Sequence, residues 1–303
     1  MFKVTLLGTA AAAPTRERGL PAVALQREGK LLLFDCGEGT QRQMMLAKPP
    51  ISNPQHIFVT HLHGDHLLGL LGLIQSLALQ NRKEPLNVYG PRDLDKIIKF
   101  NISALHVYVP YKISFHRVSP GIVLKEREFK LRAERTLHIG DSYAYRVDES
   151  TRPGRFFPEK ARALGVPQGP LWKRLQDGCT VKLDGRAIRP DEVSGPRRKG
   201  RSFGYSGDTR PTKDLVRFFR KVDLLVFDGT YSEEFVDKAK EYLHSTVGEA
   251  AQLASEAEVG RLVITHVSAR INDSALLLKQ ASKHFQNVTI GEDFSSYELA
   301  LPE

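Results

Sequence analysis

The sequence predicts a mixed α/β fold, and three observations support this prediction. Short apolar runs rich in β-branched and aromatic residues recur along the chain, and helical patterns stand between several of them. Clusters of polar side chains of the metal-ligand type follow some of these runs directly. With 303 residues and 41% hydrophobic content, the chain can bury a sizeable core as one large domain or two small ones.

The first elements are short strands. Residues 2–8 are an apolar run that ends in glycine, and the runs at 22–25 and 30–35 are joined by a turn at Glu28-Gly29. Between the first two runs, residues 13–20 contain a proline, a glycine and two arginines, which is typical of an exposed, solvated loop.

A polar segment, Thr60-His61-Leu62-His63-Gly64-Asp65-His66, lies between a strand and a helix. A helix is expected over residues 41–46. It should end before the prolines at 49 and 50, which cannot continue it. A strand over 57–60 then leads into the polar segment. Leucine and isoleucine recur at helical spacing over 67–77, so a buried helix is expected to follow.

This polar segment predicts a metal centre. Imidazole and carboxylate groups are ligands that zinc accepts, with manganese or iron as possible substitutes. In an extended loop, alternation would point His61 and His63 the same way, whereas Asp65 and His66 at the helix start could turn toward a second point. The spacing therefore suits two metal ions, and two ions need further ligands from elsewhere in the chain.

Three later strand ends each carry one such side chain, namely His138, Asp208 and His266. Taken singly, a histidine or aspartate after a strand is more often a turn or capping residue. Together with the polar segment, these three residues complete two sites.

Composition limits the remaining possibilities. The chain has neither an apolar run of about 20 residues nor the pattern of a secretory signal, so we expect a cytoplasmic protein that does not enter a membrane. Its two cysteines, Cys36 and Cys179, are expected to be free thiols.

The net charge of +9 favours an anionic partner, and residues 148–201 hold 13 Lys and Arg against seven Asp and Glu. A solvated insertion rich in cations is the simpler explanation of this excess.

The order of these motifs resembles the metallo-β-lactamase fold, and more narrowly the ribonuclease Z family. Nearly the whole chain takes part in the resemblance, including residues 34–41, 82–86, 89–91, 142–146 and 244–246. The resemblance implies a four-layer αββα sandwich that forms a single domain over residues 1–303. It also implies that residues 148–201, here called the arm, are an inserted basic flexible arm that binds substrate away from the active site.

The resemblance also assigns roles to the metal centre. It implies a zinc-dependent endoribonuclease that removes the 3′ trailer of precursor transfer RNA near the discriminator nucleotide, leaving a 3′-hydroxyl on the tRNA and a 5′-phosphate on the trailer. Two zinc ions would activate the attacking water. The implied ligands are His61, His63 and His138 for one ion, Asp65, His66 and His266 for the other, and Asp208 as a bridge.

Two residues outside the ligand set are implied to act on protons together with Asp65. Asp65 would serve as general base, and His244 would protonate the leaving oxygen. The family usually has a His-Glu-Ala-Thr run to orient that histidine, whereas this chain has Phe227-Asp228-Gly229-Thr230. Asp228 is one methylene shorter than glutamate, so either the backbone lies closer to His244 or the pairing is weaker.

The remaining implications concern RNA and partners. The arm's Gly-Pro motif and the residues after it would grip transfer RNA, and the early loop would help to set the cleavage position. The implied RNA contacts are Gly169, Pro170, Trp172, Lys173 and Arg174 in the arm and Arg16 and Arg18 in the loop. The resemblance further implies a homodimer.

Two other functions stay open at this stage. A metallo-β-lactamase-fold hydrolase of small phosphodiesters or sulfate esters would use the same two-metal centre but would have no need of the basic arm. A non-catalytic RNA-binding module with a structural metal site would keep the arm but would not need Asp65 and His244 together.

Overall fold

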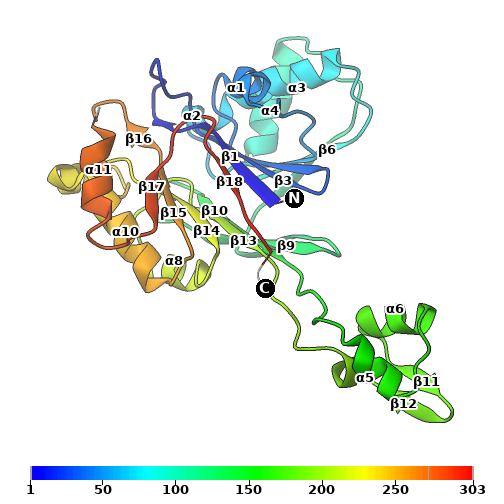
Figure 1. Cartoon of the computed structure of the whole chain (residues 1–303). Helices are drawn as coiled ribbons and strands as arrows, with labels where there is room; N and C mark the ends of the chain where they lie inside the picture. Colours follow the sequence, from blue (N-terminus) through cyan, green and yellow to red (C-terminus); the bar gives the residue numbers. More distant parts are fainter. Residues whose placement is uncertain (1, 272, 302–303) are drawn as a thin grey trace.

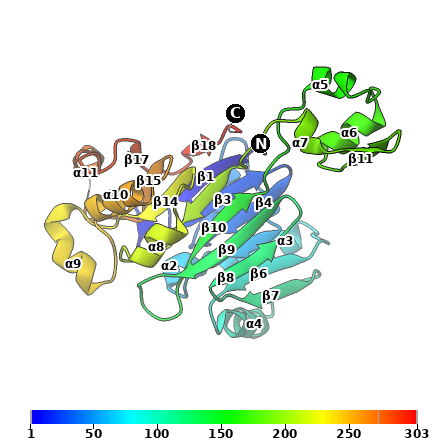
Figure 2. The same cartoon turned by 90° about the horizontal axis from the view of Figure 1, so that it is seen from below.

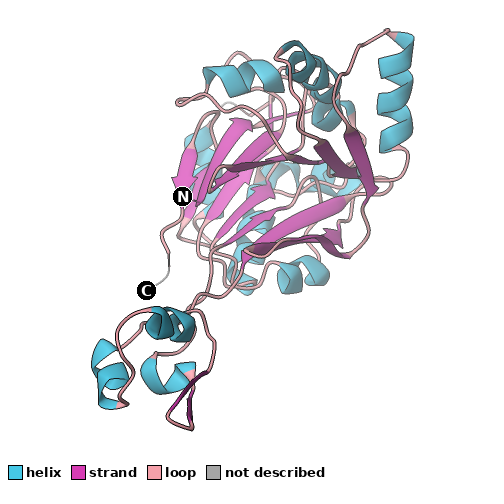
Figure 3. Cartoon of the chain, turned by 90° about the vertical axis from the view of Figure 1, so that its right-hand side faces the viewer, coloured by secondary structure: helices cyan, strands magenta, loops and turns pink. Residues whose placement is uncertain are grey.

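The computed structural model describes residues 2–271 and 273–301, which form two stacked β-sheets with helices on both outer faces (Figure 1). Figure 3 shows the two layers of strands between the helices. The predicted αββα sandwich is confirmed.

The first sheet holds mostly the N-terminal strands. Residues 2–8, 22–27 and 30–34 form strands that are buried on both faces, which explains why they read as continuous apolar runs rather than as alternating patterns. In spatial order this seven-stranded sheet contains β18 (Ser296–Glu298), β1 (Phe2–Gly8), β3 (Ala22–Arg27), β4 (Lys30–Phe34), β5 (His56–Phe58), β6 (Leu86–Gly90) and β7 (Ile113–Arg117).

The second sheet is built from the C-terminal half. Its strands β13, β14 and β15 are parallel, so their carboxyl ends meet at one edge. In spatial order it contains β17 (Val288–Ile290), β15 (Leu262–Thr265), β14 (Leu224–Asp228), β13 (Ser202–Tyr205), β10 (Tyr143–Glu149), β9 (Phe129–Arg135) and β8 (Gly121–Lys125). A separate pair, β2 (Ala10–Ala11) and β16 (Val267–Ser268), links two loops.

Aromatic residues fill the space between the sheets. Phe34 lies 5.3 Å, between ring centroids, from both Phe58 of its own sheet and Phe203 of the other sheet. Two further apolar clusters lie between each sheet and its outer helices. The helices are α1 (Thr40–Leu46), α2 (Gly64–Leu67), α3 (Gly69–Leu79) and α4 (Leu94–Ala104) beside the first sheet, and α8 (Lys213–Phe218), η1 (Glu233–Phe235), α9 (Val236–Glu241), α10 (Val247–Glu256) and α11 (Ser274–Ala281) beside the second.

The helix predicted over 67–77 differs from its prediction in one respect. A single turn, α2, precedes α3, and Leu68 separates the two. Gly69, at the start of α3, packs against the backbone of the loop that follows β4, because a Cβ at this position would lie 1.9 Å from the carbonyl oxygen of Gly37. This close approach holds α2, and with it Asp65 and His66, against the first sheet.

The long apolar stretches of this chain lie in strands and in short helices. No helix among the described residues has both the length and the apolar composition that a membrane crossing requires. Cys36, which is buried, and Cys179, which is exposed, are both free thiols.

The arm projects from the body of the molecule (Figure 1). It contains α5 (Pro158–Ala163), α6 (Pro170–Gln176), α7 (Pro190–Val193) and the hairpin of β11 (Val181–Leu183) and β12 (Arg186–Ile188). These elements enclose an apolar core of their own, whose buried members are Ala161, Val166, Trp172, Leu175, Val181, Ile188 and Val193. Figure 2 shows the arm clear of both sheets.

Residues 152–154 and 195–198 form the stalk of the arm, and their backbones lie side by side. Arg152 and Arg198 exchange backbone hydrogen bonds of 2.8 and 3.0 Å. Gly154 allows the closest approach, because a Cβ there would lie 1.9 Å from the carbonyl oxygen of Gly195. The stalk is therefore a two-stranded ribbon.

A buried ion triad lies where this ribbon joins the body. Glu149 ends β10, and its carboxylate accepts hydrogen bonds from Arg27 Nε at 2.7 Å and from Arg201 Nε at 2.7 Å. All three side chains are less than 10% exposed. Burial alone would raise the pKa of Glu149, but the hydrogen bonds and charge of the two arginines lower it. The triad ties β3 of the first sheet to both ends of the arm.

We predict that Glu149→Gln lowers the free energy of unfolding by about 3 kcal/mol, because it leaves two buried guanidinium groups without their anion. Urea denaturation of the metal-loaded protein measures this change. Glu258→Gln is the matched control, since Glu258 pairs with Arg220 at the surface with its side chain 51% exposed, and its cost should stay within about 0.5 kcal/mol. Equal losses in the two variants would contradict the structural role of the triad.

Candidate metal centre

Five histidines and two aspartates meet at the edge where the strands of both sheets end. His61 and His63 lie in the extended loop after β5, while Asp65 and His66 lie in α2. His138, Asp208 and His266 follow β9, β13 and β15. The structure thus brings together all seven side chains that are predicted to be ligands.

These side chains form two groups, each with one ligand atom per residue. His61, His63, His138 and Asp208 make one group, and their ligand atoms all lie within 4.8 Å of one another. Asp65, His66 and His266 make the other group by the same measure.

Asp208 faces both groups. Its Oδ2 lies 3.6 Å from His61 Nε2, and its Oδ1 lies 3.2 Å from His66 Nε2. Oδ2 is also 3.4 Å from His266 Nε2. A carboxylate in this position can bridge two cations, one in each group.

Most of the cluster is buried, and each titratable group shifts the pKa values of its neighbours. Burial alone would raise the pKa of Asp208, but His266, His66 and His61 hold it well below its usual value. Burial lowers the pKa of His61 well below its usual value, and the neighbouring imidazoles contribute to this shift. Burial also opposes protonation of His66, yet Asp208 and Asp35 raise the pKa of that ring. A buried cluster that holds ionised carboxylates and unprotonated imidazole is suited to bind a metal cation.

The donor set fits a divalent metal ion. His61 Nε2 is buried and has no hydrogen-bond partner within the part of the chain that the structure describes. Its other nitrogen, Nδ1, lies 2.9 Å from Thr60 Oγ1. A buried imidazole nitrogen that lacks a hydrogen bond and lies 3.6 Å from the carboxylate of Asp208 is costly in a protein, whereas coordination to zinc satisfies it.

Outer partners orient three more of the histidines. His66 Nδ1 lies 2.7 Å from Asp35 Oδ2, and His266 Nδ1 lies 2.8 Å from Thr230 Oγ1. His138 Nδ1 lies 3.1 Å from the carbonyl oxygen of Leu243, to which it can donate. An Nδ1–H bonded in this way leaves Nε2 free to face a metal.

Asp35 is the most heavily bonded of these outer partners. Its side chain is fully buried, and its carboxylate also accepts hydrogen bonds from the backbone N–H of Thr60 at 2.7 Å and from the hydroxyl of Tyr205 at 2.8 Å. The residue has a left-handed backbone with φ of 56°, which aspartate tolerates better than most residues.

His244 and Asp228 form a second pair beside the cluster. His244 Nδ1 lies 3.0 Å from Asp228 Oδ2, so the shorter aspartate reaches the histidine at full hydrogen-bond distance. Backbone and hydroxyl donors of Thr209 and Thr230 hold the buried carboxylate of Asp228 in place. Burial opposes protonation of His244, but Asp228 raises the pKa of the ring to about 9. His244 also forms a third group of possible ligands with Asp208 and His266.

Comparison with known proteins identifies the family. Residues 18–142 match the metallo-beta-lactamase superfamily, and residues 182–267 match the beta-lactamase superfamily domain. The chain is 44% identical over 300 residues to the ribonuclease Z of Methanosarcina acetivorans, with 99% of this chain and 98% of that protein covered. It is also 44% identical to the ribonuclease Z of Archaeoglobus fulgidus over 306 residues, with 100% of this chain and 99% of that protein covered.

The chain belongs to the ribonuclease Z family. A solved structure agrees: the short form of human tRNase Z is 28% identical, with a TM-score of 0.72, and the alignment covers 99% of this chain and 100% of that one. Both the predicted resemblance and the predicted superfamily are confirmed.

The structure places the predicted RNA contacts of the arm in two different environments. Gly169, Pro170, Lys173 and Arg174 are exposed at and after the start of α6. Trp172 is 8% exposed; it packs in the core of the arm and donates a 2.9 Å hydrogen bond to the carbonyl oxygen of Val166. The prediction for Trp172 needs correction, because the helix that exposes Lys173 and Arg174 turns this indole inward.

The early loop is divided in a similar way. Arg16 is exposed, whereas Arg18 is half-buried. The guanidinium of Arg18 donates to Thr9 Oγ1 at 2.7 Å and to the carbonyl oxygen of Gly291. Arg18 therefore holds the loop on the body, and Arg16 is free to meet a ligand in solvent.

Asp35, Tyr205 and Thr230 are functional partners that the sequence did not reveal as such. Asp35 and His66 are 31 residues apart, and Tyr205 is 170 residues from Asp35. Aspartate after a strand and before two glycines resembles an ordinary turn in sequence. Only its burial shows that it needs strong donors.

We predict that Asp35→Asn weakens zinc binding by roughly 10- to 100-fold, because His66 loses the carboxylate that orients its ring. Asparagine tolerates the left-handed backbone, so the loop is expected to keep its shape. Competition with a chromogenic zinc chelator measures the affinity.

Tyr205→Phe is the control for this prediction, since it removes one hydrogen bond from Asp35 and leaves the contact with His66 intact. Its affinity should change by only a few fold. Unchanged zinc affinity in Asp35→Asn would show that His66 does not depend on this carboxylate.

Proposed function

We propose that this chain is a zinc-dependent endoribonuclease that removes the 3′ trailer of precursor transfer RNA near the discriminator nucleotide. The observation that carries the proposal is the pair of adjacent ligand groups sharing Asp208, in a chain of the ribonuclease Z family. The products are a transfer RNA with a 3′-hydroxyl and a trailer with a 5′-phosphate.

Two zinc ions per subunit are the proposed cofactors, with manganese or iron as substitutes. His61, His63 and His138 would hold one ion, Asp65, His66 and His266 the other, and Asp208 would bridge them. When bound, the ions lower the pKa of a shared water and neutralise charge on the scissile phosphate.

Asp65 is the proposed general base. Its Oδ2 accepts a 3.0 Å hydrogen bond from the backbone N–H of Ala12 and lies 3.4 Å from His266 Nε2. These contacts support its position, and the side chain is 11% exposed. Burial would raise the pKa of Asp65, but His266 and His66 lower it, so the carboxylate is ionised and able to accept a proton.

His244 is the proposed general acid. Asp228 occupies its Nδ1, which leaves Nε2 to deliver a proton to the departing 5′ oxygen of the trailer. The side chain of His244 is 13% exposed, so the ring is accessible from solvent.

The arm supports RNA as the substrate rather than a small phosphodiester or sulfate ester. Its exposed Lys173 and Arg174 follow the Gly169-Pro170 motif on α6, where cations can contact phosphates without reading sequence. A small ester would leave this separate basic unit without a role.

The direction of the arm supports a homodimer. The arm leaves the body at the end of β10 and returns at the start of β13, whereas the ligands follow the carboxyl ends of β9, β13 and β15. The arm and the metal centre therefore lie at opposite ends of the second sheet, and the arm points away from its own site (Figure 1). In a two-fold dimer, the arm of each subunit would present RNA to the site of the other.

Incubation with a 3′-extended transfer RNA, with and without chelator, tests the activity directly. In the same assay, we expect His244→Ala to slow cleavage by roughly 10²- to 10⁴-fold with unchanged metal content, because the leaving oxygen loses its proton donor. Metal analysis of the purified variant is the control. Loss of metal from His244→Ala would instead make His244 a ligand of the third group.

Deletion of residues 155–195 should raise KM for precursor transfer RNA and spare hydrolysis of a small phosphodiester. The deletion is practicable because the backbones of Gly154 and Pro196 lie in contact, so one peptide link can replace the arm. Equal losses on both substrates would contradict a role of the arm in substrate binding.

A mixing experiment with the same deletion tests the dimer. At precursor concentrations well below the raised KM, the armless chain and a full-length His63→Ala chain should each cleave poorly alone. They should recover activity when mixed, because the arm of one subunit serves the site of the other. Sedimentation confirms that mixed dimers form. Mixed dimers without recovered activity would overturn the proposal.

A further inference from the structure

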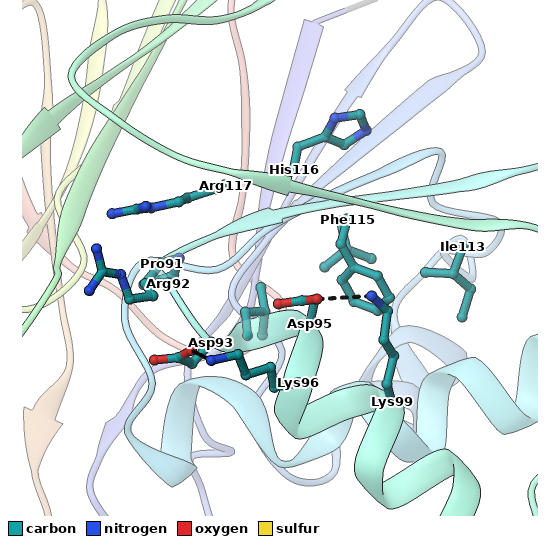
Figure 4. Close-up of a pocket in the computed structure, with 12 residues that line it drawn as sticks. Pro91, Arg92, Asp93, Asp95, Lys96, Lys99, Ile113, Phe115, His116 and Arg117 are labelled. Atoms are coloured by element: carbon teal, nitrogen blue, oxygen red, sulfur yellow. Dashed lines mark hydrogen bonds and ion pairs between the residues drawn. The ribbon is translucent and has the colours of Figure 1, made fainter.

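A groove runs between α4 and the edge strand β7 (Figure 4). Its volume is about 560 Å³, which lies in the range of pockets for small ligands. A double-helical RNA would not fit into it. We call it the α4–β7 groove, and the lining residues that matter here are Arg92, Lys96, Lys99, Ile113, Phe115 and Arg117.

The α4–β7 groove is continuous with the metal centre. Pro91, Arg92 and Asp93 line the groove and also line a second hollow, which His61 and His63 line as well. A chain bound at these histidines can therefore continue past Arg92 into the groove.

The lysines of the groove are already neutralised, whereas its arginines are not. Lys96 pairs with Asp93 at 2.7 Å, and Lys99 pairs with Asp95 at 2.9 Å. Arg92 and Arg117 are exposed, and within the described part of the chain neither guanidinium has a hydrogen-bond or ion-pair partner. Figure 4 shows both arginines on the same side of the groove, near Pro91. Two unpaired guanidinium groups on one side of the groove can contact phosphates.

The face of β7 that lines the groove combines this charge with apolar surface. Ile113, Phe115 and Arg117 alternate along the strand, so they share one face. Phe115 is half-buried, and the ammonium group of Lys99 lies 5.5 Å from its ring centroid. Arg117 and Phe115 thus place an unpaired cation and an aromatic ring on one face, which is the combination that single-stranded nucleic acid uses, with phosphates on the cation and bases against the ring.

We propose that the α4–β7 groove binds the single-stranded 3′ trailer of the precursor. Arg92 and Arg117 hold trailer phosphates, and Phe115 and Ile113 contact a base. The inference rests on the proposed endoribonuclease function and extends it to the part of the substrate that is cut off. A folded transfer-RNA body is too wide for the groove, whereas an unpaired strand leaving the metal centre fits it.

Cleavage of two precursors tests the groove. One carries a single-nucleotide trailer and the other a long unstructured trailer. In the variant Arg92→Ala/Arg117→Ala, KM for the long trailer should rise about tenfold, because two phosphate contacts are lost, and KM for the single-nucleotide trailer should not change. An equal rise for both precursors would overturn the proposal.

Binding of a single-stranded oligoribonucleotide, measured with chelator present, tests the groove without cleavage. The slope of log affinity against log salt should fall by about 1.4 in the double alanine variant, which is about 0.7 for each lost phosphate contact. Arg92→Lys/Arg117→Lys should keep the slope of the unmodified chain, because it keeps the charge. An unchanged slope in the alanine variant would overturn the proposal.

Lys125→Ala/Lys130→Ala is the matched control. These exposed lysines are cross-strand neighbours on β8 and β9, so the variant removes the same charge outside the groove. KM should not change for either precursor in this variant. A change equal to that of the groove variant would mean that the effect depends on net charge alone, which would overturn the proposal. If the unmodified chain cleaves neither precursor, the proposed function fails, while the oligoribonucleotide experiment still reports on the groove.

Discussion

The structure depends on one electrostatic constraint, which is the meeting of five imidazoles and two carboxylates, most of them buried, within a few ångströms of each other. Asp208 lies between the two groups, and its distances to His61, His66 and His266 leave room for cations rather than for direct hydrogen bonds to all three. Such a cluster is stable only if its nitrogens and oxygens have partners. The fold meets this need by ending four strands at one edge and by fixing the outer nitrogens of the histidines.

Asp35 connects this edge to the core. The aspartate directly follows Phe34, whose ring contacts Phe58 and Phe203 between the sheets. Its carboxylate receives His66 from α2, the Thr60 backbone after β5, and Tyr205 from the other sheet. Packing of the two sheets therefore also orients the metal ligand His66, because the groups that meet at Asp35 come from both layers.

The two ends of the second sheet have separate tasks. One end carries the ligands, together with His244 and Asp228, and the other carries the arm on its bonded ribbon. The Arg27–Glu149–Arg201 triad anchors that ribbon to the first sheet. The arm carries exposed cations at one end, and the α4–β7 groove beside the ligands carries exposed arginines at the other. This separation is the physical reason for considering a dimer.

The sequence by itself determined the chemistry of the centre and the class of fold. His61, His63, Asp65 and His66 are close in the chain, so local geometry suffices to place them, and apolar runs predict the strands that end at the other ligands. The tertiary structure alone decided which distant residues support them, since Asp35 and Tyr205 meet only when two sheets pack. It also turned Trp172 into the core of the arm and set the arm's direction, because burial and strand polarity depend on the whole fold.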